Sequence, residues 1–463
     1  MSPDVALSVG TTIKMKSMTK LIRATCTVIV VAIVATGCAE SQRPQATGKG
    51  NIRGINAIVS APPVAFLVEE RAQGLLGFKD GLGSRFDDLP YKLNFDVRFV
   101  GDDENTRLAT QAIDVVANTE YILSLTGTLA APAITVWQQP ERDWEGNETS
   151  FEASFGHLTD SVGTVDVYYD APGIAPAAGN ARGSIAKDGF IPAAEFPAGA
   201  YQLILTAAND PATIIYTSPT TTPGGALSLT YTFFDADPSI TGPLSVRLMP
   251  SAGTSVELPD LNSPPTYRTY HGAFGTGNYD AYINADLTTA IAADVAFSQI
   301  SGDTDAVVGD NIITFTAAGN AGSTLLQSTT AALAGARHSM FLAGPPGSLT
   351  SMSMVDDRRP EQTIGKFRLV HSAANTGAVD IYVTAPGIDI ANVLPNLARI
   401  SQFTSTDYAR LNAGTYEARI TPAADKTVIG GPLTLDFATD GIADLALLDT
   451  ADPNVFTLAE WGN

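Results

Sequence analysis

The sequence contains very little cysteine. Its 463 residues include two, Cys26 and Cys38, and Cys26 falls in an apolar stretch that we expect export to remove. The mature chain would retain a single thiol, which excludes an intramolecular disulfide and a zinc site built from paired cysteines. The domains must therefore be stable through their hydrophobic cores alone.

Charged residues are also scarce, and basic ones above all. They make up 16% of the chain, against about 25% in typical globular domains, a composition that favours exposed β domains over helical bundles. The 27 Lys and Arg face 48 Asp and Glu, which gives a formal net charge of −21. Without residues 1–37 the counts fall to 23 and 47, a net charge of −24. Because phosphate binding requires a basic face, we expect no nucleic-acid partner.

Motifs for cofactors and catalysis are absent as well. The sequence has no G-x-x-x-x-G-K-[ST] loop, no G-x-G-x-x-G after a strand, no H-E-x-x-H and no G-x-S-x-G elbow. We therefore expect no cofactor, no resident metal and no enzymatic activity. The acidic turns at 101–105, 235–237, 303–305 and 449–452 lack the spacing of the twelve-residue calcium loop. Asp is a common turn former, so we interpret these turns as solvated, and a rod stiffened by bound calcium stays an alternative.

The N-terminal segment has the features of an export signal. Four basic residues precede an apolar stretch of twelve residues at 24–35, and a bilayer span would need about 20. The stretch leads into Ala-Thr-Gly-Cys at 35–38. This sequence resembles the lipobox of bacterial lipoproteins, with Ala35 where the pattern prefers Leu. The resemblance implies cleavage after residue 37 and acyl chains on Cys38, and the alternatives are a plain secretory signal or an uncleaved single-pass anchor.

The residues around this cysteine also predict a location. Ala39, rather than Asp, follows Cys38, which resembles the outer-membrane sorting rule of Gram-negative lipoproteins. We therefore expect the membrane to be a partner through the lipid anchor. The protein would lie in the envelope of a Gram-negative-type bacterium, at the outer membrane. The true start codon is left open among three methionines, Met1, Met15 and Met18.

One motif recurs down the chain. Residues 155–174 (FGHLTDSVGTVDVYYDAPGI) align with residues 369–388 (LVHSAANTGAVDIYVTAPGI). Both segments place a His nine residues before an Asp, and a third segment keeps the same pair. A degenerate first copy has Asn56 and Ala65 in their place. The three pairs are His157 and Asp166, His271 and Asp280, and His371 and Asp380.

The pattern along each copy predicts strands. Short segments with alternating apolar residues recur between turns rich in Gly, Pro and Asp. The predicted fold is therefore all-β, with tandem immunoglobulin-like antiparallel β-sandwich domains after the lipoprotein signal. Polar linkers are predicted at 141–150, 250–265 and 356–362. The predicted parts are a signal peptide at 1–37, a flexible tether at 38–50, a divergent sandwich at 51–145, a sandwich at 150–250, a divergent sandwich at 265–358 and a sandwich at 362–463.

A known family shares the motif. The pattern V-H-S-A-(x)5-V-D-I-Y-V, followed by A-G-T-Y, resembles the bacterial domain-of-unknown-function family 4397. The resemblance is fullest over 366–449 and 153–235, and less complete over 267–343 and 52–137. It implies an immunoglobulin-type sandwich in exported and cell-surface proteins, often in tandem, and it implies no activity.

The repeated pair is the patterned polar feature that chemistry could use. A His late in one strand and an Asp early in the next could meet across a hairpin, as two members of a catalytic triad do. No Ser or Thr repeats in register beside the pair. We therefore favour a hydrogen bond that pins the first hairpin, with metal binding and catalysis as alternatives. Trp137, Trp144 and Trp461 are aromatics that could stack on sugars. Trp137 alternates within a strand pattern and is predicted to lie in the core, whereas Trp144 lies in a linker and is the better candidate.

Two functions are consistent with these features. The first is a non-enzymatic cell-envelope lipoprotein whose tandem sandwiches form a surface binding, adhesion or spacer module, with a glycan or protein as ligand. The second is an enzyme or accessory domain for the breakdown of extracellular polymers such as polysaccharides, which would use one His–Asp pair. The second predicts that His157 or His371 is exposed in a cleft, next to a hydroxyl or a second carboxylate.

Overall fold

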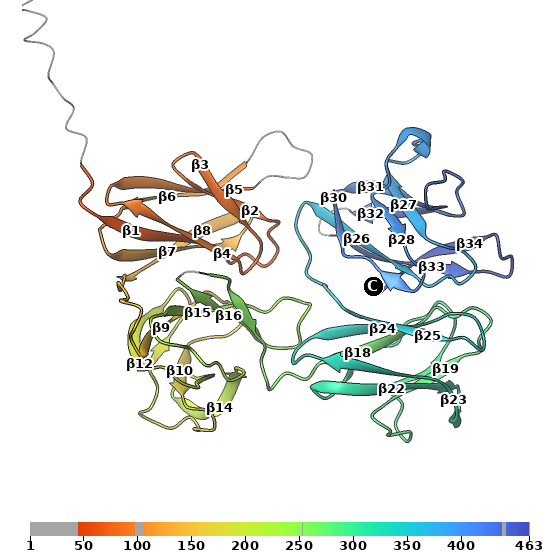
Figure 1. The fold of residues 1–463 in the computed structure, drawn as a ribbon, viewed down its shortest axis with the longest axis horizontal. Coiled ribbons are helices and arrows are strands. Elements are labelled where there is room, and N and C mark those ends of the chain that lie inside the picture. The colour runs from red at the N-terminus through yellow and green to blue at the C-terminus, as the bar shows by residue number, and fades with distance from the viewer. Residues whose placement is uncertain (1–44, 98–105, 252, 438–440, 463) are drawn as a thin grey trace, which may run out of the picture. The chain divides into compact units, whose positions relative to one another are not determined.

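A computed structural model of the chain (Figure 1) describes residues 45–97, 106–251, 253–437 and 441–462. Cys38 and the predicted signal lie outside the described residues, as does the acidic turn at 101–105. In the part of the chain that the structure describes, no helix is long and apolar enough to cross a membrane.

The first two sandwiches each consist of two facing sheets. In the first, the strand orders are β4-β1-β7-β8 and β3-β2-β5-β6, and in the second they are β12-β9-β15-β16-β17 and β11-β10-β13-β14. The strands of the first are β1 (Lys49–Asn56), β2 (Val64–Val68), β3 (Arg71–Leu76), β4 (Gly81–Asp87), β5 (Pro90–Val97), β6 (Thr106–Asp114), β7 (Thr119–Thr128) and β8 (Ala131–Pro140). Those of the second are β9 (Ser150–His157), β10 (Val165–Asp170), β11 (Gly183–Ile185), β12 (Phe190–Pro197), β13 (Gln202–Ala207), β14 (Asp210–Thr217), β15 (Ser228–Asp235), β16 (Leu244–Pro250) and β17 (Val256–Leu258).

The third and fourth sandwiches follow the same plan. The third has the orders β21-β18-β24-β25 and β20-β19-β22-β23, whereas the fourth joins its two sheets through one parallel bridge between Gly430 and Phe456. The strands of the third are β18 (Thr266–His271), β19 (Tyr279–Ile283), β20 (Ala292–Val295), β21 (Thr304–Asp305), β22 (Gly309–Ala317), β23 (Asn320–Ala332), β24 (Arg337–Ala343) and β25 (Thr350–Val355). The fourth contains β26 (Ile364–His371), β27 (Val379–Thr384), the 3-10 helix η1 (Ile390–Asn392), β28 (Leu397–Ile400), β29 (Thr404–Ser405), β30 (Ala409–Asn412), β31 (Gly414–Pro422), β32 (Gly430–Phe437), β33 (Ile442–Asp449) and β34 (Phe456–Trp461).

The predicted fold class is confirmed: the described chain is all-β and built of tandem sandwiches. Its connectivity differs from the immunoglobulin order, in which the first strand pairs with the second. Here the first strand of each of the first three sandwiches pairs antiparallel with the fourth strand and parallel with the seventh, as β1 does with β4 and β7. In the fourth sandwich, β26 pairs antiparallel with β29 and β30 and parallel with the eighth strand, β33. The repeats also match in register. Four parallel pairs occupy one equivalent position: Asn56 with Leu125, His157 with Phe233, His271 with Leu342 and His371 with Leu447.

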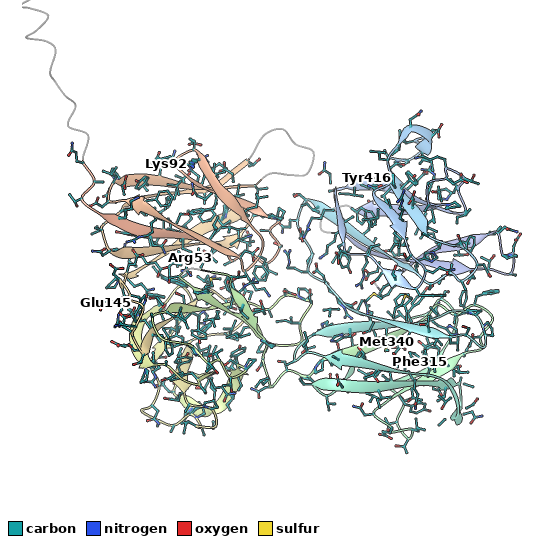
Figure 2. All side chains as sticks on the ribbon, viewed as in Figure 1. Arg53, Lys92, Glu145, Phe315, Met340 and Tyr416 are labelled. Atoms are coloured by element: carbon teal, nitrogen blue, oxygen red, sulfur yellow. The ribbon has the colours of Figure 1, made fainter. Side chains whose placement is uncertain are left out.

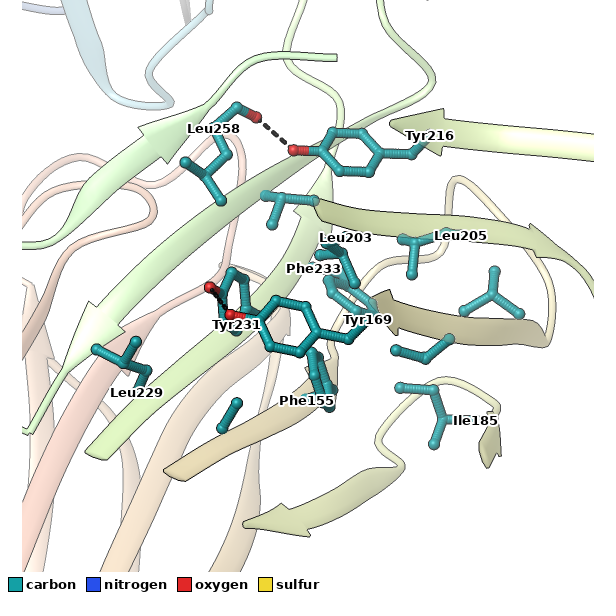
Figure 3. Packing of buried hydrophobic residues seen from close by; sticks show 14 of the residues in the cluster. Phe155, Tyr169, Ile185, Leu203, Leu205, Tyr216, Leu229, Tyr231, Phe233 and Leu258 are labelled. Carbon is teal, nitrogen blue, oxygen red and sulfur yellow. Dashed lines mark hydrogen bonds between the residues drawn. The ribbon is translucent and has the colours of Figure 1, made fainter. Parts of the chain in front are cut away.

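Each sandwich encloses its own core. In the second, Phe155, Tyr169 and Tyr231 pack between the two sheets, and the hydroxyls of the two tyrosines lie 2.8 Å apart (Figure 3). In the third, Phe315 and Met340, which Figure 2 labels, belong to the corresponding core. These side chains come from alternating apolar positions, which point to one face of a strand.

Two further apolar clusters lie outside these cores. One joins the first and second sandwiches and includes Ile122, Trp137 and Phe234. The other joins the third and fourth and includes Tyr270, Phe341 and Trp461. As a result, strands such as β1 and β26 are buried on both faces. The sandwiches within Gly48–Asn463 therefore belong to one compact unit.

One predicted linker is partly wrong. β17 lies inside the segment 250–265 and pairs antiparallel with β16, so the second sandwich continues beyond residue 250. Three residues between turns rich in Pro, Ser and Gly carry too short an alternation to show as a strand in the sequence.

Candidate functional site

The repeated histidines occupy one structural position in three sandwiches. Each closes its first strand, and each side chain is 0% exposed. The Nε2 atom of His157 lies 3.0 Å from the carbonyl oxygen of Gly163, and His271 and His371 make the same contact with the glycine six residues on, at 3.0 and 2.9 Å. Because a carbonyl can only accept, the proton of the neutral ring sits on Nε2. The histidine thus fixes the loop that joins the first two strands.

Burial decides the charge of these rings. It lowers the pKa of His157, His271 and His371 below the ordinary value of 6.5, because the charged ring would be removed from water. The Nδ1 atom of each ring has no hydrogen-bond partner among the described residues. A protonated ring would therefore carry a second N–H with no acceptor.

The repeated aspartates bond elsewhere. Asp166 accepts a hydrogen bond from the main-chain N–H of Asn209, at 2.7 Å. Asp380 accepts one from Ala424, at 3.1 Å, and a second from Arg399, at 2.7 Å. Asp280 likewise accepts from the N–H groups of Gly319 and Asp294, at 2.8 Å each.

These N–H donors share a backbone conformation. Asn209, Gly319 and Ala424 follow the equivalent strands β13, β22 and β31, and their φ angles are 61, 71 and 64°. Asp294 and Arg399 also have positive φ angles, 51 and 54°. Left-handed residues other than glycine are strained, so the carboxylate holds a turn that would otherwise be unfavourable.

The histidine and the aspartate of a pair do not bond each other in the described structure. Each satisfies main-chain groups of a different loop, so the contact across the hairpin that would build a catalytic pair is not formed. In the first sandwich, Asn56 replaces the histidine: its Nδ2 donates to the carbonyl of Leu76 and its Oδ1 accepts from the N–H of Ile58, at 3.2 and 3.1 Å. Ala65 replaces the aspartate and offers no acceptor.

The sequence prediction missed a third repeated residue. It interpreted the acidic turns at 235–237 and 449–452 as solvated, which is wrong for Asp235 and Asp449. Asp235 accepts hydrogen bonds from the N–H groups of Asp160 and Ser161, at 2.6 and 2.9 Å, and Asp449 does the same for Ala374 and Asn375, at 2.7 and 3.0 Å. Both lie two residues after the strand partner of the histidine. The equivalent residues in the first and third sandwiches are Gly127 and Gly344, with φ angles of 82 and 91°. The similarity of FFDADP and LLDTADP was the signal that could have found the two aspartates.

A buried ionic cluster lies where the third and fourth sandwiches meet. Asp356 is fully buried and pairs with Arg268 at 2.9 Å and with Arg368 at 2.7 Å. Arg368 also pairs with Asp444 at 2.6 Å. Burial alone would raise the pKa of Asp356, but the two guanidinium groups outweigh it and the pKa lies below its ordinary value. Both arginines stand three residues before the repeat histidine, a recurrence that the sequence contains.

The predicted linker 356–362 is bonded along its length. Asp356 contacts the third and fourth sandwiches, and Asp357 accepts a hydrogen bond from Ser239 of the second, at 3.3 Å. Arg359 donates to the carbonyl of Val59 in the first, at 2.9 Å. Glu361, also fully buried, pairs with Arg410 at 2.8 Å. The segment therefore contacts all four sandwiches, which its polar composition did not reveal.

Other candidates are engaged in similar ways. Of the acidic turns, Asp237 pairs with Lys79 at 3.5 Å, and Asp303 pairs with Arg358 at 2.6 Å. Within the described residues, no three His, Cys, Asp or Glu side chains are grouped as metal ligands. A groove of about 480 Å³ between the first and second sandwiches is lined by residues that include Arg53. That guanidinium is itself paired with Glu120, at 2.9 Å.

The three tryptophans differ in exposure. Trp137 and Trp461 are 5% and 4% exposed, and Trp137 stacks on Phe190 with the ring centres 5.0 Å apart. Trp144 is half-buried: its Nε1 donates to Ser228, at 3.0 Å, and Arg142 lies 4.0 Å from its ring centre. Trp144 is therefore the more accessible aromatic platform.

Residues 265–382 match the family model described as Domain of unknown function (DUF4397). This confirms the resemblance in the segment that holds the third sandwich and the start of the fourth. No curated protein matches the chain. A solved structure of the Bacillus anthracis TIE protein is 10% identical, with 88% of this chain and 69% of that chain covered. Its TM-score of 0.15 is too low to indicate a shared fold.

Proposed function

We propose that the chain is a non-enzymatic cell-envelope lipoprotein, in which tandem sandwiches form a rigid surface module for binding or adhesion. Cys38 would carry the lipid, and the membrane would be a partner through that anchor. A glycan or protein ligand would bind the exposed loops, because loops on a rigid scaffold are where sandwich proteins place their binding residues.

One observation carries this proposal. The His and Asp residues that repeat in register form their hydrogen bonds inside the sandwiches. The histidines bond main-chain carbonyls, and the aspartates bond main-chain N–H groups. Such residues specify a scaffold.

The anchor is tested by lipid labelling in the native bacterium. Cells grown with radioactive palmitate should yield a labelled protein in the outer-membrane fraction, and Cys38→Ser should abolish both the label and the membrane association. Cys26→Ser provides the matched control, because that thiol lies in the segment expected to be removed. A wild-type protein without label, or one that retains residues 15–37, would contradict the proposal.

The alternative function, an enzyme that degrades polysaccharides, requires His157 or His371 to be exposed in a cleft, and neither is exposed. His157 and His371 are fully buried and bonded to glycine carbonyls, so neither ring is within reach of a substrate in solvent. Incubation of the mature protein with envelope and plant polysaccharides is the direct check. Hydrolysis that His371→Asn abolishes while the fold persists would restore the enzyme.

A further inference from the structure

The third sandwich ends in a long unprotected edge strand. β23 has 13 residues and is the last strand in the order β20-β19-β22-β23. Among the described strands, β22 alone pairs with it. One edge of β23 therefore presents main-chain N–H and C=O groups that no neighbouring strand uses.

The equivalent strands of the other sandwiches are protected. β6 carries Arg107 and Asp114, and β14 begins with Asp210 and a proline. β32 contains a proline and an aspartate and also pairs with β34. Charges and prolines are the devices by which natural sheets prevent edge-to-edge pairing.

β23 has none of these devices. Its sequence, NAGSTLLQSTTAA, contains no charged residue and no proline. Its irregular pairing is confined to the first part of the strand, and from Leu326 to Ala332 it pairs with β22 without interruption. Because the register of this stretch is regular, another strand can pair with its free edge.

The composition also indicates what the other strand is. The mature chain would carry a net charge of −24, so two copies repel each other over most of their surface. β23 offers a surface without charge, and its Ser and Thr side chains can pair with their own kind across an antiparallel contact. Nothing on the strand would select a charged donor peptide.

We propose that β23 pairs antiparallel with β23 of a second copy of this chain. The two four-stranded sheets would then form one continuous sheet about a two-fold axis. Because the same edge serves both copies, the contact closes on itself and gives a dimer instead of a filament. The mature chain would thus bind a second copy through the third sandwich.

Sedimentation of the mature chain with Cys38→Ser tests the proposal. The protein is expected to be a dimer at micromolar concentration, and Thr324→Lys with Thr329→Lys should raise the dissociation constant by about tenfold or more, since lysines on an edge repel across it. Thr213→Lys with Thr434→Lys is the matched control. It places the same charges on exposed threonines of β14 and β32, the equivalent strands, and should leave the dimer intact.

Amide exchange supplies a measurement that needs no variant. The N–H groups on the free edge of β23 should exchange more slowly as the wild-type concentration rises. A wild-type protein that stays monomeric, or exchange that does not depend on concentration, overturns the proposal. So does a dimer that the β23 lysines leave intact. Exchange that slows only when envelope extract is added would overturn it in favour of a strand from another protein.

Discussion

At the scale of single residues, the repeat histidines make stability depend on pH. Burial lowers the pKa of His157, His271 and His371 below 6.5. The unfolded chain therefore binds protons near pH 6.5 that the folded chain does not. Above pH 6.5 the contribution of each buried histidine to stability is fully present. As the pH drops below 6.5, the free energy of unfolding falls by about 1.4 kcal/mol per pH unit for each histidine.

This dependence can be measured by urea unfolding between pH 7.5 and 5.5, above the range in which carboxylates titrate. We expect His371→Asn to make the slope shallower, because Asn serves the same position in the first sandwich. A replacement that lowered stability equally at every pH would show that the pKa of His371 is the same in the folded and unfolded states.

The aspartates act at single residues too. Asp380→Ala should lower the free energy of unfolding by about 2–4 kcal/mol, because it leaves the N–H groups of Arg399 and Ala424 without an acceptor at strained positions. The control is Asp389→Ala, which removes an exposed carboxylate that caps η1. A loss of less than 1 kcal/mol for Asp380→Ala, by chemical denaturation, would mean that water replaces the carboxylate.

At the scale of elements, the segment 356–362 is the feature to test. Removing one partner of a buried ion pair leaves the other uncompensated, so Asp356→Ala should cost about 3–5 kcal/mol. Asp160→Ala, which breaks the exposed pair with Lys187, should cost about 1 kcal/mol or less. Thermal unfolding of both variants measures the contrast, and equal losses would contradict the buried cluster.

This segment also shows where sequence reasoning stops. Alternation and turn residues predicted the strands, and the spacing of His371 and Asp380 predicted a structural pair, because both signals are local. The partners of the pair could not be predicted, since they depend on which loop residues adopt positive φ. The ionic partners of Asp356 lie 88 and 12 residues away in Arg268 and Arg368. Composition alone made this segment resemble a solvated linker.

At the scale of the whole chain, the repeating unit is a pair of sandwiches. The first and third have a glycine where the second and fourth have Asp235 and Asp449. The apolar clusters follow the same alternation, since one joins the first to the second and the other joins the third to the fourth. Four similar motifs in the sequence thus form two pairs of sandwiches within one compact unit.

The apolar cluster that joins the third and fourth sandwiches predicts that these two sandwiches unfold together. Their shared cluster contains Tyr270 and Phe341 from one and Trp461 from the other, with the rings of Phe341 and Trp461 4.5 Å apart. Asp380→Ala, in the fourth sandwich, should therefore speed amide exchange in β24 of the third as well as in β27.

The coupling should depend on the shared cluster. In a Trp461→Ala background, which removes a buried ring worth about 3–5 kcal/mol, the effect of Asp380→Ala should stay within the fourth sandwich. Trp144→Ala is the control, because that half-buried ring lies outside the cluster. If Asp380→Ala leaves exchange in β24 unchanged when Trp461 is present, the two sandwiches are independent, and the apolar contact between them does not carry cooperativity.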